Sequence, residues 1–210
     1  MPFVTRVWMS DPSRVDRDSN QESVNAVGEK AAVGGLLKLS AAIDRLNEIV
    51  GRTVYWLVLV VVLISATNAI IRKLFNSSSN AWLEWQWYLF GVIFLLCSGY
   101  ALLRQEHIRI DIVASHLSPR ANNRIALFGH LFFLIPLCIV MLVEGWPYFY
   151  ESYRINELSS NAGGLIRWPI KLVAVIGFAL LLLQGISEAI KQIGIMRGVY
   201  VDTRQRNSEH

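Results

Sequence analysis

Hydrophobic positions of this chain gather in long blocks that are separated by short polar stretches. Residues 53–71, 85–103 and 125–143 each form 19 consecutive positions without Asp, Glu, Lys or Arg. A helix needs about 20 apolar residues to cross the hydrocarbon core of a bilayer. The pattern therefore predicts three transmembrane helices. Ser118 followed by Pro119 is typical of a helix start, so the third helix should begin near Arg120, slightly before its apolar block.

A fourth block is shorter, with 16 charge-free residues at 172–187. Lys171, Glu188 and Lys191 stand at its edges, where long charged side chains can reach toward water from a membrane helix. We therefore predict a fourth span over residues 169–190, which completes a four-helix transmembrane domain over residues 53–191.

Basic residues predict the orientation of these spans. Fifteen of the 20 Lys and Arg residues lie in the N-terminal segment, in the loop between the second and third spans, or at the C-terminus, and 5 lie on the other side. The positive-inside rule then places both termini in the cytoplasm. Five tryptophans would meet the outer interface, as belt residues do: Trp82, Trp85, Trp87, Trp146 and Trp168.

The segment before the first span has helical periodicity. Leu36, Leu39, Ile43, Leu46 and Val50 recur at steps of three and four, which predicts an amphipathic helix over residues 36–52. It would lie in the cytoplasmic membrane interface or pack against a partner subunit, because both places produce this pattern. Residues 1–35 lack the apolar region of a signal peptide and are predicted to form a disordered cytoplasmic tail, with a second cytoplasmic tail at 192–210.

Composition agrees with a membrane protein. The 210 residues are 53% hydrophobic and 17% charged, with a mean hydropathy of +0.39, whereas soluble domains average about 25% charged residues. The predicted fold class is an all-α integral membrane protein with four transmembrane helices and both termini cytoplasmic. Membrane lipids are expected partners, and nucleic acid is not.

Signatures of chemistry are missing from the chain. There is no phosphate-binding Gly-rich loop, no His-Glu-x-x-His and no Gly-x-Ser-x-Gly. Cys97 and Cys138 lie inside apolar blocks, where a thiol behaves as a small hydrophobe, so neither a disulfide framework nor a metal site is indicated. We expect no catalytic residue, no cofactor and no enzymatic activity.

Two other classes of membrane protein fit the sequence less well. A haem- or quinone-associated membrane anchor of a redox complex needs two well-placed histidine ligands, but within the spans only His130 is present, while His107 and His116 belong to the loop and His210 ends the chain. An independent carrier usually has inverted repeats and broken spans. Here Pro136 is the one proline within the charge-free blocks, and no repeat is visible.

Polar clusters at the ends of the spans remain. Glu84, Trp85 and Gln86 open the second span on the outer side, and Glu106-His-Ile-Arg-Ile-Asp111 follows it on the inner side. Such residues form either a solvated membrane edge or a docking surface that fixes the register of a neighbouring subunit. In the outer loop before the fourth span, Gly163 and Gly164 are predicted turn formers.

Taken together, these motifs resemble the small membrane subunit, of the DctQ type, of the tripartite ATP-independent periplasmic (TRAP) transporters. The resemblance covers about Ile43 to Lys191 and is most similar to the branch often labelled for mannitol or chloroaromatic compounds. It rests on Asp44-Arg-Leu-Asn-Glu-x-Val-Gly-Arg52, Glu84-Trp-Gln-Trp-Tyr-Leu-Phe90, Glu106-His-Ile-Arg-Ile-Asp111, Gly163-Gly-Leu-Ile-Arg-Trp-Pro-Ile-Lys171 and Gly177-Phe-Ala-Leu-Leu-Leu-Leu-Gln-Gly185. The chain departs from that branch at Ile166 and at Ala174-Val175, where proline is often found.

The resemblance implies an accessory scaffold in the bacterial inner membrane. In this family a large membrane subunit carries the substrate and sodium sites and moves, and a periplasmic solute-binding protein captures an organic acid or related solute. The small subunit holds the large one and helps to dock the binding protein, so uptake is driven by an ion gradient, as in a symporter. By position, the implied subunit-interface residues are Glu84, Trp85, Gln86, His107, Arg109, Asp111, Arg167, Trp168 and Lys171, with Gly163 and Gly164 in the outer turn.

Overall fold

The computed structural model describes residues 12–75, 80–104, 119–161 and 163–196. Its helices are α1 (Pro12–Phe75), α2 (Asn80–Arg104), α4 (Pro119–Gly129), the π-helical segment η1 (His130–Leu134), α5 (Ile135–Arg154) and α6 (Trp168–Met196). Within the described residues, four helical stretches are long and apolar enough to cross a membrane: Gly34–Leu74, Asn80–Arg104, Arg124–Arg154 and Trp168–Met196. The predicted all-α fold class with four membrane helices is therefore confirmed.

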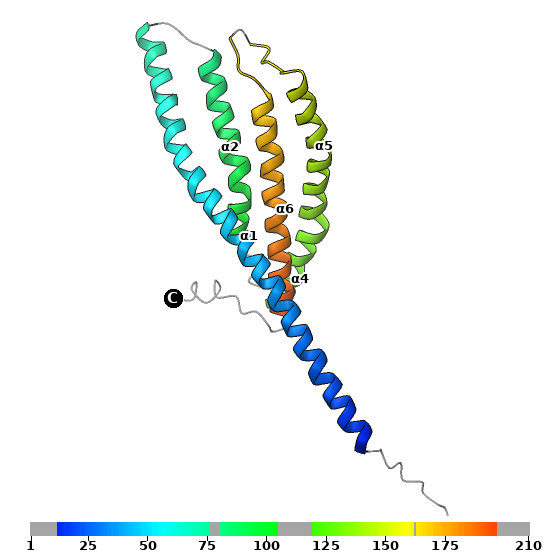
Figure 1. Cartoon of the computed structure of the whole chain (residues 1–210). Helices are drawn as coiled ribbons and strands as arrows, with labels where there is room; N and C mark the ends of the chain where they lie inside the picture. The colour runs from blue at the N-terminus through cyan, green and yellow to red at the C-terminus, as the bar shows by residue number, and fades with distance from the viewer. Residues whose placement is uncertain (1–11, 76–79, 105–118, 162, 197–210) are drawn as a thin grey trace, which may run out of the picture.

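The four long helices stand side by side in the order α1, α2, α6 and α5 (Figure 1). Helix α6 is central, since it contacts α1, α2, α4, η1 and α5. Helix α5 lies on the edge, and its buried residues are Cys138 and Ser152. The N-terminal part of α1 continues past the end of the bundle (Figure 1).

Helix α1 is one continuous helix over residues 12–75, where the sequence indicated a disordered tail, an interfacial helix and a span as separate segments. Its contact face coincides with the predicted apolar stripe only in part, since Ile43 of that stripe is buried. Leu36, Leu39 and Leu46 are exposed, whereas Ser40 and Asn47 are buried against the bundle. Inside a membrane the apolar face of a helix belongs with the lipid, so polar and small residues make the helix contacts.

The third helix begins at Pro119 and contains a π-helical turn at His130–Leu134. Its start agrees with the Ser118-Pro119 signal. The wider turn is followed directly by Pro136 at the start of α5. Proline lacks an N–H and its ring crowds the carbonyl four residues earlier, so a local widening of the helix accommodates it.

Close approaches between helices depend on small residues. A Cβ atom at Gly99 of α2 would lie 2.3 Å from Asn47 Oδ1 of α1, and one at Gly177 of α6 would lie 2.8 Å from the backbone oxygen of Leu95 in α2. Helices α1, α2 and α6 are therefore held closer together than larger residues would allow.

The contrast between two glycines gives a first prediction. Gly99→Ala should destabilise the bundle by about 1–3 kcal/mol, because the added methyl group displaces the buried Asn47 side chain. Gly129 has helical dihedrals and open space around the position of a Cβ atom. Gly129→Ala should therefore stabilise the helix by up to about 1 kcal/mol. Unfolding of the purified variants in detergent would measure both, and equal shifts would contradict the packing at Gly99.

Candidate subunit-contact surface and its internal supports

Glu84 fastens the α5–α6 loop, residues 155–167, to helix α2. Its Oε1 atom accepts hydrogen bonds from Ser159 Oγ and from Asn161 Nδ2, the latter at 2.7 Å, and its Oε2 atom accepts one from the Leu165 backbone N–H at 2.6 Å. The residue is 7% exposed. This group, the Glu84 clamp, directs the carboxylate into its own chain rather than outward to a neighbour.

Backbone bonds give the α5–α6 loop a defined shape. The Ser159 N–H donates to Leu165 O and the Arg167 N–H donates to Glu157 O, both at 2.9 Å, beside an isolated antiparallel bridge between Leu158 and Ile166. Gly163 sits at φ +70°, a left-handed conformation that glycine adopts without strain. A Cβ atom at Gly164 would lie 2.5 Å from Ser159 Cβ. The two glycines thus let the loop fold back beneath the clamp.

A partly buried lysine, Lys171, ties the same loop to α5 and α6. The Lys171 ammonium forms an ion pair with Glu157 and lies 3.7 Å from the centre of the Tyr148 ring. Nearby, Trp168 packs edge-on against Tyr153, with ring centroids 5.5 Å apart. Lys171 and Trp168 therefore both support the loop from within the chain.

The Glu157–Lys171 pair gives a pH-dependent prediction. The pKa of the Glu157 carboxyl is lowered from its ordinary 4.5, chiefly because Lys171 donates a hydrogen bond to it. A lowered folded-state pKa contributes stability above pH 4.5, and this contribution is lost as the pH falls below that value. The difference in Tm between the wild type and Glu157→Gln should thus shrink from neutral pH to about pH 4. Exposed Glu151, replaced by Gln, is the matched control, and a pH-independent difference for Glu157→Gln would contradict the pairing.

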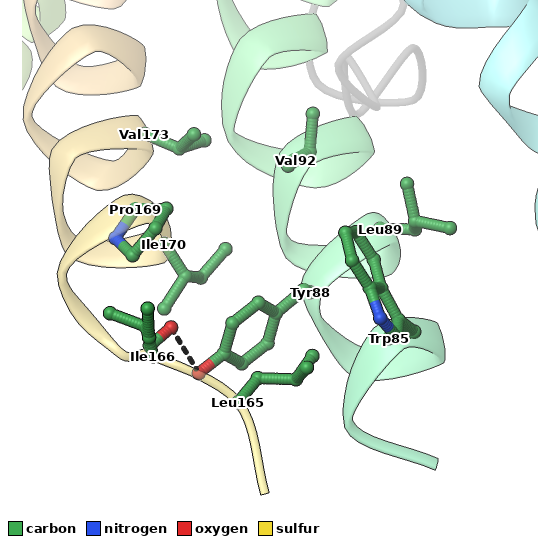
Figure 2. Close-up of a pocket in the computed structure, with 9 residues that line it drawn as sticks. All are labelled: Trp85, Tyr88, Leu89, Val92, Leu165, Ile166, Pro169, Ile170 and Val173. Carbon is green, nitrogen blue, oxygen red and sulfur yellow. Dashed lines mark hydrogen bonds between the residues drawn. The ribbon is translucent and has the colours of Figure 1, made fainter. Parts of the chain in front are cut away.

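An apolar pocket lies between α2 and the start of α6, next to this loop (Figure 2). Its volume is about 330 Å³, and the Tyr88 hydroxyl at its edge donates a hydrogen bond to Ile166 O at 3.3 Å. Trp85, one of its walls, is half exposed. The pocket has the chemistry to take an apolar side chain, and its lining residues are Trp85, Tyr88, Leu89, Val92, Leu165, Ile166, Pro169, Ile170 and Val173.

Exposed aromatic residues surround this end of the bundle. Trp87, Trp146, Tyr148 and Tyr150 are each more than half exposed, while Gln86 and Arg167 are partly exposed. Together with Trp85 they form a surface that a protein or the membrane interface could cover. We refer to these residues and the α5–α6 loop as the aromatic end.

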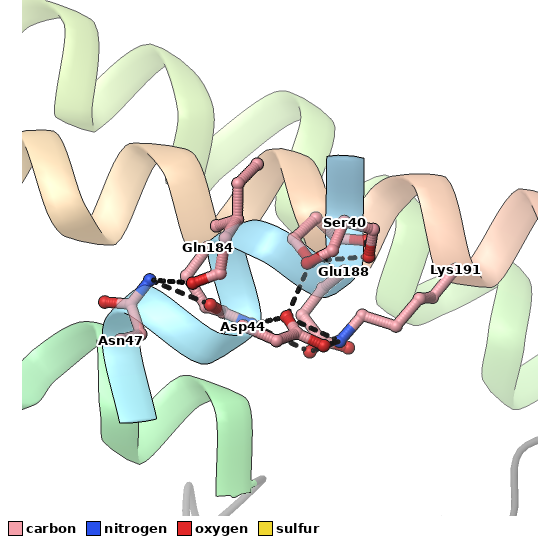
Figure 3. Close-up of polar contacts among 8 residues, drawn as sticks. Ser40, Asp44, Asn47, Gln184, Glu188 and Lys191 are labelled. Carbon is pink, nitrogen blue, oxygen red and sulfur yellow. Dashed lines mark hydrogen bonds and ion pairs between the residues drawn. The ribbon is translucent and has the colours of Figure 1, made fainter. Parts of the chain in front are cut away.

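A polar cluster lies at the other end, between α1 and α6 (Figure 3). Lys191 Nζ lies 2.9 Å from Asp44 Oδ2 and 2.5 Å from Glu188 Oε1. Ser187 Oγ donates to Asp44 Oδ1 at 2.7 Å. Gln184 Nε2 donates to Asp44 Oδ1 at 2.9 Å. We call this the α1–α6 polar cluster, and it also includes Ser40 and Asn47, which bond to Ser187 and Gln184.

Burial of the α1–α6 polar cluster corrects one expectation. Glu188 and Lys191 were expected to reach toward water, but they are 3% and 4% exposed and bond to each other and to the rest of the cluster. Their pairing with a helix more than 140 residues away replaces hydration of the charges. In the sequence, Asp44 is far from Glu188 and Lys191, and no local pattern connects them. Their contact could therefore not be predicted from the sequence.

Three of the expected interface residues, His107, Arg109 and Asp111, lie outside the described residues. Of the others, Glu84 and Lys171 make internal contacts, and Trp85, Gln86, Arg167 and Trp168 lie at the aromatic end. Among the described residues, no group of three His, Cys, Asp or Glu side chains could hold a metal ion.

Comparison with known proteins gives one match. Residues 61–194 match the family model of the tripartite ATP-independent periplasmic transporters, DctQ component. No curated protein and no solved structure matches the chain significantly. The matched region runs from the last quarter of α1 nearly to the end of α6, so it includes the Glu84 clamp and the α6 half of the polar cluster.

Proposed function

The chain belongs to the DctQ component family of the tripartite ATP-independent periplasmic transporters, and we propose that it is the scaffold subunit that holds the large membrane subunit of such a transporter in the bilayer. The proposal includes uptake of an organic acid or related solute, driven by an ion gradient that is bound elsewhere. It also places the protein in the bacterial inner membrane with both termini cytoplasmic, as the basic residues indicate.

The observation that carries this proposal is the outward apolar surface of the bundle. Helix α5 contributes exposed large side chains along its length, and α1 does so between residues 55 and 74. Surface of this kind has two uses in a membrane, lipid contact and contact with another membrane protein. The exposed set on these two helices includes Tyr55, Trp56, Leu59, Val62, Leu63, Ile70, Leu74, Leu137, Ile139, Val140, Val143 and Trp146.

Several charged side chains of the bundle form bonds within the chain, in contrast to the apolar side chains that face outward. Lys191 bonds to both Asp44 and Glu188, and Glu84 bonds to the α5–α6 loop. These contacts hold α1 against α6 and the α5–α6 loop against α2, as expected for a scaffold. A solute pathway would instead turn polar groups toward a shared cavity.

For the aromatic end we propose the periplasmic side and contact with the solute-binding protein. The Glu84 clamp and the Glu157–Lys171 pair support a loop of defined shape, and a pre-formed surface loses little conformational entropy on binding. Gln86, Arg167 and the exposed tryptophans are the contact residues in this proposal. His107, Arg109 and Asp111 are proposed for the cytoplasmic contact from the sequence motif alone.

Photo-crosslinking in cells tests the scaffold proposal. A crosslinking amino acid at Val140, which is 57% exposed on α5, should form an adduct with a larger polytopic membrane protein, while one at Cys138, which is 0% exposed, should not. The two positions lie on the same helix at nearly the same depth, and they differ in whether the side chain faces outward or into the bundle. Co-purification in mild detergent is the second measurement.

Three results would overturn the assignment. Full recovery of the stable chain without any partner would remove the scaffold role. Solute uptake by the purified chain alone in vesicles would make it a carrier. A visible absorption band that disappears on His130→Ala would instead indicate the haem-associated anchor.

A further inference from the structure

A second groove lies between α1 and α2, at the end of the bundle where the α1–α6 polar cluster lies. Its volume is about 590 Å³. Arg52 stands at its edge and is the last charged residue of α1 before the charge-free positions 53–71. The groove therefore starts at the boundary between polar and apolar surface, and its walls include Gly51, Tyr55 and Val58 of α1 and Ile93, Cys97 and Tyr100 of α2.

The shape of the groove depends on Gly51. A Cβ atom at this position would lie 2.3 Å from Tyr100 Cγ, so the Tyr100 ring rests directly on the α1 backbone. Tyr55 on the α1 side is 70% exposed and Val58 is 43% exposed, which leaves the groove open along one side. It is a mostly apolar groove that faces the surroundings of the bundle.

Two arginines are held together at the polar end of this groove. Arg52 Nη2 and Arg104 Nη2 lie 2.7 Å and 3.1 Å from the same carboxylate oxygen, Glu48 Oε1. Arg104 also donates a hydrogen bond from Nε to the Tyr100 hydroxyl at 3.1 Å and lies over its ring. Two positive charges face one negative charge, so the group of Glu48, Arg52 and Arg104 has a net charge of +1.

This charge matches an anionic ligand with a long apolar part. Side chains of Arg52 and Arg104 are 70% and 44% exposed, so their guanidinium groups are open to a ligand. A guanidinium has five N–H donors in a planar fork that fits phosphate oxygens. Trp56, which is 68% exposed at the same groove, is the amphipathic type of side chain that lies at the level of lipid headgroups.

We propose that this groove is a binding site for one anionic phospholipid. The phosphate binds between Arg52 and Arg104, and one acyl chain lies along Gly51, Tyr55 and Cys97. An apolar partner helix in the groove would leave the net positive charge without a counterion, which is costly in a membrane. The site does not depend on the proposed transport role.

Native mass spectrometry of the full chain tests the charge requirement. In detergent with equal amounts of phosphatidylglycerol and phosphatidylcholine of the same chains, we expect retention of phosphatidylglycerol. The Arg52→Gln/Arg104→Gln variant should retain about tenfold less, as expected when charge-assisted contacts to phosphate are removed. Arg45→Gln, an exposed arginine outside the groove, is the matched control.

A variant of opposite sign keeps the test independent of folding. Glu48→Gln removes the competing carboxylate and should increase retention of phosphatidylglycerol, because both guanidinium groups become free for the phosphate. Equal retention by the wild type, the double variant and Glu48→Gln would overturn the proposal. Equal retention of the two lipids by the wild type would overturn it as well.

Photo-crosslinking identifies the occupant in cells. A crosslinking amino acid at Val58, inside the groove, should give a phospholipid adduct that is reduced in the Arg52→Gln/Arg104→Gln variant. An adduct with a polypeptide, either a second copy of the chain or a partner helix, would show that a protein covers the groove and would overturn the proposal.

Discussion

Replacing Lys191 by methionine should lower the free energy of unfolding by about 3–5 kcal/mol, the cost of leaving a buried charge without its partner. Lys191 is 4% exposed and is the cation that faces both Asp44 and Glu188. Its removal leaves two carboxylates side by side between α1 and α6. The measurement is unfolding of the purified protein in mixed micelles, with exposed Lys38, replaced by methionine, as the control.

Asp44→Asn should have a much smaller effect, at most about 1.5 kcal/mol. The variant keeps an acceptor oxygen for Gln184 and Ser187, and it leaves Lys191 paired with Glu188 in a neutral couple. Adding Glu188→Met to Lys191→Met should recover part of the loss, since one unpaired acid is then removed. Equal effects of Lys191→Met and Asp44→Asn would contradict the arrangement of the α1–α6 polar cluster.

Glu84→Gln should release the α5–α6 loop from α2. The carboxylate accepts three hydrogen bonds, and an amide places an N–H group where one oxygen accepted. The Leu165 amide hydrogen, bonded to Glu84 Oε2 at 2.6 Å, should exchange with solvent about tenfold faster or more, because the loop opens locally without unfolding the bundle.

Hydrogen exchange measured by mass spectrometry would show whether this change is local. Exchange in the central part of α6 should stay the same, and Glu151→Gln, which removes an exposed acid paired with Arg154, should leave Leu165 unaffected. Unchanged exchange at Leu165 in Glu84→Gln would mean that the loop is held by its backbone bonds and the Glu157–Lys171 pair instead.

Much of the fold could be predicted because each membrane span requires a block of about 20 mostly apolar residues, and such blocks are visible in the sequence. Charge-free blocks and the Ser118-Pro119 helix start correspond to helices of the structure. Helix α6 extends to Met196, beyond the expected 190, because Lys191 forms ion pairs with Asp44 of α1 and with Glu188. This extension depends on a tertiary contact, which hydropathy along the chain does not contain.

The periodicity of residues 36–52 marked an apolar side of α1 for the membrane interface or a partner subunit, and the contact of α1 with the bundle uses a largely different set of positions. Of the predicted stripe, Leu36, Leu39 and Leu46 are exposed, whereas Ile43 is buried together with Ser40 and Asn47. An apolar stripe marks the packed side of a helix in water. Next to lipid, polar side chains are stabilised when they are buried against another helix. In this segment Ser40, Asp44 and Asn47 recur at steps of four and three, and this polar row marks the side of α1 that contacts α6.

The site was only partly accessible to sequence reasoning. The motif that begins at Glu84 marked the correct end of α2, but its partners Ser159, Asn161 and Leu165 are 75 to 81 residues away. Nothing in the local pattern says whether such a carboxylate faces a neighbour or its own chain. The geometry shows that Glu84 bonds to its own chain, and in our proposal it supports the contact surface rather than forming part of it.

Fixing α6 at both of its ends has a mechanical consequence. Lys191 bonds to α1 near one end of this helix, and Lys171 bonds to the α5–α6 loop near the other. Sliding α6 by a single helical turn, about 5.4 Å, would separate both ammonium groups from their carboxylates at once. The contacts near both ends of α6 therefore oppose its movement along its own axis. We expect the larger thermal motions to be bending of the edge helix α5 rather than sliding of the central helix α6.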